Sequence, residues 1–300
     1  MMRYLNAFVT ATGLTFLLFA PSSCAQAATA PASDTPAFSS VPELEDGFHD
    51  LYIQKFPEAR EIFQKWTNDH PEEPFGQVAI AASYLFEEFY LQHVLTSDYF
   101  LNDKRFLGGI AGTPDPDRIR GFETAAANAR SLAFQRLKNK SRDPEGLYAL
   151  TLIAGMESDA SSMLLKKHLD ALKHLKEANA NAQLLLKERP DAYDAYVALG
   201  CANYIIGSLP GSARFMLWFG GIHGDKQLGM QQVQKTVEGG RYLKPFAKIL
   251  LALSARREKQ NALAQKLLKD LTEEFPGNPV YTTEYEESLG HPIPAVIAPN

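Results

Sequence analysis

The sequence contains only two cysteines among its 300 residues. Cys24 lies in an N-terminal segment that we expect to be removed, which would leave Cys201 without a partner. A disulfide within the mature chain is therefore excluded. The chain does not need one, because a body of roughly 270 residues buries enough apolar surface to be stable alone.

Basic residues are neither in excess nor clustered. The sequence contains 30 lysines and arginines and 35 aspartates and glutamates, which gives a net charge of −5. Binding to nucleic acid or to anionic lipid through a basic block is therefore not expected. Segments that alternate apolar and polar residues, as half-buried strands do, are missing as well. With 45% hydrophobic and 22% charged residues, the composition is that of an ordinary globular protein, and we predict an all-α fold.

Motifs that mark an active site are missing too. The glycine-rich segment Gly220–Lys226 lacks the spacing and the Gly-Lys-Ser/Thr end of a phosphate-binding loop, so we interpret it as a turn in which Asp225 caps the next helix. Gly207–Gly211 is not a Gly-x-Ser-x-Gly elbow, and the seven histidines form no His-Glu-x-x-His or His-x-His motif. Asp170 and His174 are interpreted as a surface pair, because two groups do not make a metal site. We therefore predict a protein that is not an enzyme and has no cofactor and no metal ion.

The first 27 residues have the layout of a secretory signal peptide. Arg3 supplies the positive charge, residues 7–20 form the apolar run, Pro21 ends it, and Ala25-Gln26-Ala27 offers small residues for cleavage. The run of about 14 apolar residues is shorter than the roughly 20 that span a membrane, which disfavours a membrane anchor. We therefore predict cleavage after Ala27 and export to the periplasm.

The alternative for this segment is a lipid anchor on Cys24. Small residues precede Cys24, as in bacterial lipoprotein signals, but Pro21 stands where those signals want a leucine. Residues 28–42 are rich in alanine, proline, serine and threonine and are predicted to be a flexible linker. Residues 43–290 are predicted to be a helical repeat domain, and the proline-rich residues 291–300 a disordered tail.

The clearest helical pattern runs across a proline break. Ala178 and neighbouring small residues lie on the first helix, Pro190 ends it, and Tyr196, Leu199 and Gly200 belong to the next. This is the order found in tetratricopeptide repeats (TPRs), where a small residue on helix B and a proline precede W-x2-L-G on the next helix A. The stretch therefore resembles a TPR junction.

Comparable patterns predict about five helix pairs that form a TPR-like α-solenoid with insertions. Gly47 and Ala264 fall at the glycine and alanine positions of the first and the last pair. The prolines that close the pairs are not spaced at multiples of the roughly 34-residue repeat, which we explain by insertions and lengthened helices. The predicted pairs are 44–53 with a helix that begins at Pro57, 75–94 with 122–137, 147–160 with 163–188, 192–207 with 227–237, and 243–257 with 261–275, followed by a capping helix at 283–289.

Four motifs in the second half of the chain carry a narrower resemblance. They are Asp191-Ala-Tyr-Asp-Ala-Tyr-Val-Ala-Leu-Gly200, Asn203-Tyr204, Gly207-Ser-Leu-Pro210 and Phe219-Gly-Gly-Ile-His-Gly-Asp-Lys226. Together they resemble a group of exported bacterial TPR proteins of unassigned function, and more loosely the tetratricopeptide repeat protein 39 family. The resemblance spans roughly residues 143–281 and implies TPR-mediated binding, with association to lipid droplets or mitochondria in the eukaryotic family. Neither group brings a catalytic motif to this sequence.

Thr96–Asp117 is an unusually long predicted connection, with three glycines and several aromatic residues. Connections longer than about a dozen residues are uncommon in compact domains and are often functional. Two interpretations stay open for this segment. It is either a functional loop or an aromatic-rich loop that packs over a helix end.

The repeats predict a non-enzymatic interaction or scaffold module that holds a protein or peptide partner in the concave groove of the solenoid. The A helices line such a groove, and plain packing between repeats is the alternative for each residue on it. The repeat register places Asp194, Val197, Cys201 and Tyr204 on this surface in the fourth pair, and Ile249, Leu253 and Arg256 in the fifth.

Five consecutive large apolar residues, Phe215–Phe219, give a second hypothesis. They are either a buried insertion or a wedge that touches a partner or a lipid surface through side chains such as Phe215 and Trp218. In the second case the protein is a membrane-associated assembly or lipid-handling protein with peripheral membrane contact. A greasy pocket beneath Thr96–Asp117 would favour this alternative.

Overall fold

The computed structural model describes residues 38–291, except residues 210, 212–213 and 215–222. The predicted signal peptide, most of the predicted linker, the apolar segment Phe215–Phe219 and residues 292–300 lie outside the described residues.

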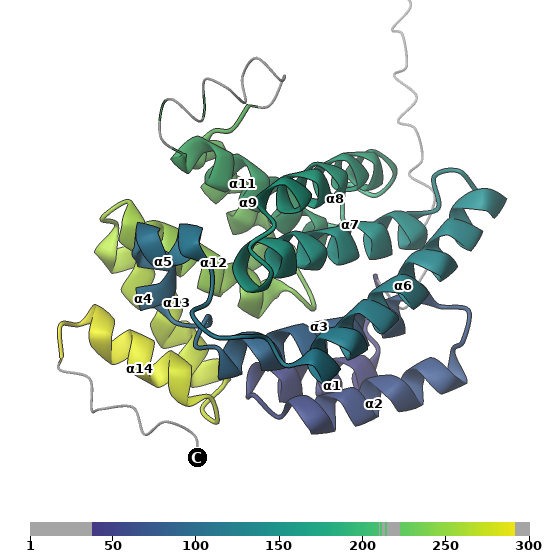
Figure 1. Cartoon of the computed structure of the whole chain (residues 1–300), viewed down its shortest axis with the longest axis horizontal. Helices are drawn as coiled ribbons and strands as arrows, with labels where there is room; N and C mark the ends of the chain where they lie inside the picture. The colour runs from purple at the N-terminus through teal and green to yellow at the C-terminus, as the bar shows by residue number, and fades with distance from the viewer. Residues whose placement is uncertain (1–37, 210, 212–213, 215–222, 292–300) are drawn as a thin grey trace, which may run out of the picture. The chain divides into compact units, whose positions relative to one another are not determined.

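Thirteen α-helices and no strand form the described part of the chain, so the predicted all-α fold is confirmed (Figure 1). A π-helical turn, η1 (Ala160–Leu164), follows α7, and a 3₁₀ turn, η2 (Tyr193–Ala195), precedes α9. The α-helices are α1 (Pro42–Tyr52), α2 (Phe56–Asp69), α3 (Pro74–Leu91), α4 (Ser97–Leu101), α5 (Asp103–Gly108), α6 (Pro116–Asn139), α7 (Pro144–Asp159), α8 (His168–Glu188), α9 (Tyr196–Ser208), α11 (Lys226–Gly239), α12 (Lys244–Arg257), α13 (Asn261–Glu274) and α14 (Pro279–Ser288).

Prolines and short polar side chains set where many of these helices begin. Seven helices carry proline in their first two positions. The N–H group that proline lacks would have no partner within the helix at these positions, so no hydrogen bond is lost. Asp115, Asp143 and Asn278 accept hydrogen bonds from the first-turn N–H groups of α6, α7 and α14. Asp225 accepts one from the N–H of Leu228 at 2.8 Å, which confirms the predicted cap of α11.

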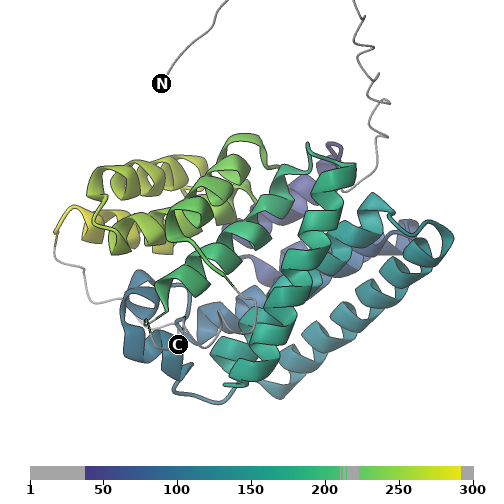
Figure 2. The same cartoon turned by 90° about the horizontal axis from the view of Figure 1, so that it is seen from above.

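The longer helices pack mainly against their neighbours in the chain, from the purple α1 to the yellow α14 (Figures 1 and 2). The order of contact is α1, α2, α3, α6, α7, α8, α9, α11, α12, α13 and α14. Two crossings need glycine, because a Cβ atom on Gly47 would overlap the Phe63 ring and one on Gly200 would overlap Val233. Ala178 and Ala264 are fully buried on α8 and α13, as expected for small residues at helix crossings.

The predicted loop at 96–117 contains two short helices, α4 and α5. The side chain of Asn102 accepts hydrogen bonds from the N–H groups of Lys104 and Arg105, so it caps α5. Helix α6 also begins six residues earlier than the predicted 122, because Asp115 caps it and Pro116 opens it. The longest irregular part of the segment is therefore the stretch between α5 and α6.

The predicted helix 163–188 is wrong at its start. Helix α7 runs on into the π-helical turn η1, Lys166 takes a left-handed conformation with φ of 57°, and α8 begins at His168. Leu164 therefore belongs to η1, where it is buried, and not to α8. Leu169, in the first turn of α8, is 85% exposed.

The first helices also contact the last ones. The hydroxyl of Tyr52 on α1 donates to the carbonyl oxygen of Tyr242 at 2.8 Å, and the amide of Asn278 donates to the carbonyl oxygen of Tyr52 at 2.7 Å. The rings of Phe86 on α3 and Phe246 on α12 meet edge to face, with centroids 5.6 Å apart. Helix α12, three residues of which were predicted to line the concave groove, thus packs against α3.

Candidate binding cavity

An apolar cavity of about 90 Å³ lies where α1, α3, the residues around α4, α12 and α14 meet. Its walls are almost entirely aliphatic and aromatic, because each of these helices turns an apolar face inward. The N-terminal half of the chain contributes Leu51, Phe86, Leu95 and Phe100, and the C-terminal half contributes Phe246, Ile249, Leu253 and Tyr281.

Three of the predicted partner-binding residues line this one cavity. Ile249, Leu253 and Arg256 lie on α12 at a spacing of three to four residues, which places them on one face. Leu95 and Phe100, on the opposite wall, come from the segment that the sequence marked as long and rich in aromatic residues. The contact between this segment and α12 could not be predicted from the sequence, because more than 140 residues separate them.

The polar side of the cavity is a cluster around Arg256. Its guanidinium lies 3.1 Å from Glu284 Oε2 and 3.3 Å from Glu287 Oε1, and it also donates to the hydroxyl of Ser97. The backbone N–H of Ser97 donates to Glu284 Oε1 at 2.9 Å. Burial raises the pKa of Glu284, while the hydrogen bonds from Ser97 and the charge of Arg256 oppose that rise. Arg256 is therefore neutralised by two carboxylates and joins α12, α14 and the start of α4.

The other predicted partner-binding residues do not line the cavity. Asp194 is buried and accepts hydrogen bonds from the N–H groups of Arg241 and Tyr242 and from the hydroxyl of Tyr148, at 2.8 to 3.1 Å. Burial raises the pKa of Asp194, and these donors counteract it. Val197 is buried as well. Both residues take part in packing within the protein.

Cys201 and Tyr204 lie farther along α9. Burial raises the pKa of the Cys201 thiol, and the charge of Asp159 raises it further, so the thiol stays neutral and unreactive. The hydroxyl of Tyr204 donates to Glu258 Oε1 at 3.3 Å, and Lys226 binds the same oxygen at 2.8 Å. Tyr204 thus links α9 to the end of α12. Phe215 and Trp218 lie outside the described residues.

One buried hydroxyl near the cavity has no partner. Tyr99 on α4 is 5% exposed, and its hydroxyl makes no hydrogen bond within the described part of the chain. Burial raises the pKa of Tyr99 to about 12. An unpaired buried hydroxyl costs about 1–3 kcal/mol of stability, so this position of α4 carries a penalty that no sequence pattern signals.

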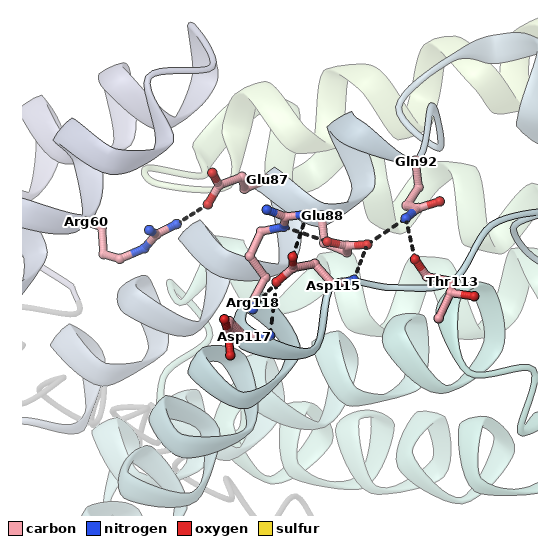
Figure 3. A network of polar contacts seen from close by, with 8 residues as sticks. All are labelled: Arg60, Glu87, Glu88, Gln92, Thr113, Asp115, Asp117 and Arg118. Atoms are coloured by element: carbon pink, nitrogen blue, oxygen red, sulfur yellow. Dashed lines mark hydrogen bonds and ion pairs between the residues drawn. The ribbon is translucent and has the colours of Figure 1, made fainter. Parts of the chain in front are cut away.

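A polar network fixes the two ends of the connection that contains α4 and α5 (Figure 3). Glu88 is fully buried on α3 and accepts hydrogen bonds from Arg118 at 2.6 Å, from Gln92 at 2.8 Å and from the N–H of Asp115 at 3.2 Å. The amide of Gln92 also donates to the carbonyl oxygen of Thr113 at 3.1 Å. The end of α3 is therefore tied to the beginning of α6.

A second acidic cluster lies apart from the cavity. Glu157, His174 and Glu177 place one ligand atom each within 4.8 Å of one another. The guanidinium of Arg130 already binds both carboxylates, at 3.0 Å to Glu157 and 2.6 Å to Glu177, and it would repel a metal ion. His174 lies 3.2 Å from Glu157, so the predicted pairing of His174 with Asp170 is replaced by a pairing across helices.

No family model, no curated protein and no solved structure matches this chain. The resemblance to exported TPR proteins therefore stays a prediction that rests on the quoted motifs. Within the described residues, no helix combines the length and the apolar character that crossing a membrane requires.

Proposed function

We propose that the chain is a TPR-type solenoid whose inner face has been partly filled by its own helices. Successive contacts from α1 to α14 support this reading, since a solenoid places each helix pair against its neighbours. The close crossings at Gly47 and Gly200, two positions named from the repeat pattern, support it as well. The helices α4 and α5 are then an insertion within the second pair.

On this scaffold the protein acts as a non-enzymatic binding module that takes a short apolar side chain of a protein or peptide partner into the cavity. The observation that carries this proposal is the position of Ile249, Leu253 and Arg256. All three were expected to face a partner, and all three line the same apolar cavity. Pockets that combine apolar walls with a few polar groups at one side are typical binding sites.

The size of the cavity favours a side chain over a lipid tail. An engineered cavity of about 150 Å³ holds one benzene molecule, which corresponds to about 25 Å³ for each carbon atom. On that scale the 90 Å³ found here accommodates about three or four carbon atoms. This is the size of a valine or leucine side chain, whereas a long acyl chain would need several times the volume.

A lipid-handling protein is the second candidate. The cavity is lined by Leu95, Thr96 and Phe100. It therefore lies at the segment Thr96–Asp117, where an apolar pocket was expected to favour this function. It requires a larger cavity than the described one, and therefore a displacement of α4. Co-sedimentation with liposomes tests this candidate. If the wild-type protein sediments with liposomes and a variant with a filled cavity does not, the result favours lipid handling over peptide binding.

The first candidate is tested with peptides on an array and with a variant that fills the cavity. In Leu253→Trp the larger ring occupies the cavity, so we expect the affinity for bound peptides to fall at least tenfold, which is about 1.4 kcal/mol. Ile249→Phe is a milder filling variant if Leu253→Trp loses stability. Leu289→Trp is the matched control, because Leu289 is exposed and does not line the cavity. Equal affinity in the filling variants and the control would contradict the proposal.

A further inference from the structure

We infer that α4, together with the preceding Leu95 and Thr96, is a lid that opens to admit the ligand, a proposal that rests on the binding function proposed for the cavity. These residues, 95–101, are called the lid below. Leu95, Thr96, Ser97 and Phe100 of the lid form one wall of the cavity, so moving the lid would open that wall.

The connection is anchored at both ends and has a backbone hinge on each side of the lid. Gln92 and Asp115 are tied to Glu88, which holds the two ends together (Figure 3). His93 and Gly109, the residues that flank the lid and α5, have φ of 56° and 70°, in the left-handed region. Both residues lie at the end of a helix, and hinges are often such element-terminal residues, which absorb the change in φ and ψ. Movement is thus confined to the segment between two fixed points.

Distant residues hold the lid closed. The guanidinium of Arg256 binds the Ser97 hydroxyl, and Arg257 donates to the carbonyl oxygen of Phe100 at 2.7 Å. Glu284 accepts the N–H of Ser97 at 2.9 Å, and the Ser97 hydroxyl donates to Glu287 at 3.2 Å. These partners belong to α12 and α14. Because Arg256 and Glu284 also line the cavity, a bound ligand and the closed lid share the same side chains.

The unpaired hydroxyl of Tyr99 opposes closure. Tyr99 is buried when the lid is closed, and its hydroxyl makes no hydrogen bond within the described part of the chain. Opening would expose this hydroxyl to water, which offers it the missing partner. The polar contacts favour the closed lid, whereas the buried hydroxyl favours the open lid. The two effects set an equilibrium that ligand binding can shift.

Two variants shift this equilibrium in opposite directions without touching the cavity wall. Tyr99→Phe removes the unpaired hydroxyl, so hydrogen exchange of the amides of Ser97–Leu101 should slow by about tenfold. Glu287→Gln removes one charge from the contacts that hold the lid, so exchange should become about two- to fivefold faster. Tyr90→Phe and Glu286→Gln are matched controls, since neither residue lines the cavity, the Tyr90 ring packs on Phe56, and Glu286 pairs with His291. The experiment uses the full-length chain and mass spectrometry, with the amides of α2 as the internal reference.

The lid proposal is overturned if Tyr99→Phe and Glu287→Gln both exchange like wild type, or if both change the rate in the same direction. A separate measurement tests the cavity itself.

Xenon, a small apolar probe, should bind in the cavity and shift the methyl NMR signals of Leu95 and Leu253 in the wild-type protein. If xenon causes no shift, the proposed binding function is overturned. The lid proposal is tested by the exchange rates alone, so a failure of one proposal can be told from a failure of the other.

Discussion

Asp159, at the end of α7, shows how one partly buried carboxyl group sets a pH dependence. Burial raises the pKa of Asp159 from 3.8 to about 7. Its carboxylate makes no hydrogen bond or ion pair within the described residues, so nothing there stabilises the charged form. The charge of Asp159 also raises the pKa of Cys201, which keeps that thiol neutral. Asp194, which is buried, differs because its carboxylate accepts four hydrogen bonds.

The pKa of Asp159 predicts that the protein loses stability as the pH rises. The folded state holds this proton up to pH about 7, whereas the unfolded state releases it near 3.8. The free energy of unfolding therefore falls as the pH rises from about 4 to about 7. Asp159→Asn should remove this component, which is on the order of 2–4 kcal/mol. Urea unfolding at pH 5 and pH 8 measures it, with exposed Asp69→Asn as the control, and an unchanged pH dependence in Asp159→Asn would refute the assignment.

At the scale of the elements, the sequence patterns predicted the long helices and missed the short ones. Long helices such as α8 and α12 repeat their apolar residues over several turns, and that periodicity is readable from sequence. Helices α4 and α5 are five and six residues long, too short to show a period. The π-helical turn η1 is supported by a contact from the insertion, where the N–H of Ile110 donates to the carbonyl oxygen of Met163 at 2.9 Å. Tertiary contacts of this kind leave no local pattern.

The predicted helix crossings are tested with Ala178→Leu and Ala264→Leu. Both alanines are fully buried, so a leucine at either position should overpack the helix interface and lower the free energy of unfolding by about 1–3 kcal/mol. Ala127→Leu, on the exposed face of α6, should have little effect and serves as the control. Thermal midpoints that stay unchanged in both buried variants would show that the repeat register is wrong.

At the scale of the whole molecule, the site depends on contacts between the two ends of the sequence. The register placed Ile249, Leu253 and Arg256 on one face, and they do share one cavity. The opposite wall was not predictable, because a repeat pattern describes how neighbouring pairs pack and does not say that α1 meets α12 and α14. The hydrogen bonds of Tyr52 with Tyr242 and Asn278 join these distant helices. The three residues predicted to line the concave groove are thus found around an apolar cavity.

Export is a prediction for the whole chain that rests on the N-terminal sequence. We expect the mature protein to begin at Ala28, because Ala25 and Ala27 are the small residues that signal peptidase requires. Intact-mass measurement of the protein from an exporting bacterial cell checks this. A mature chain that begins with a lipid-modified Cys24 would instead place the protein on a membrane.

The size dependence of ligand binding tests the central claim most directly. A peptide selected on the array is resynthesised with its apolar anchor changed to alanine, valine, leucine, phenylalanine or tryptophan, and each affinity is measured by calorimetry. Because the cavity of about 90 Å³ holds about three or four carbon atoms, affinity should be highest for valine or leucine and at least about tenfold lower for alanine and tryptophan. An affinity that is independent of anchor size, or that rises steadily to tryptophan, would contradict binding in this cavity.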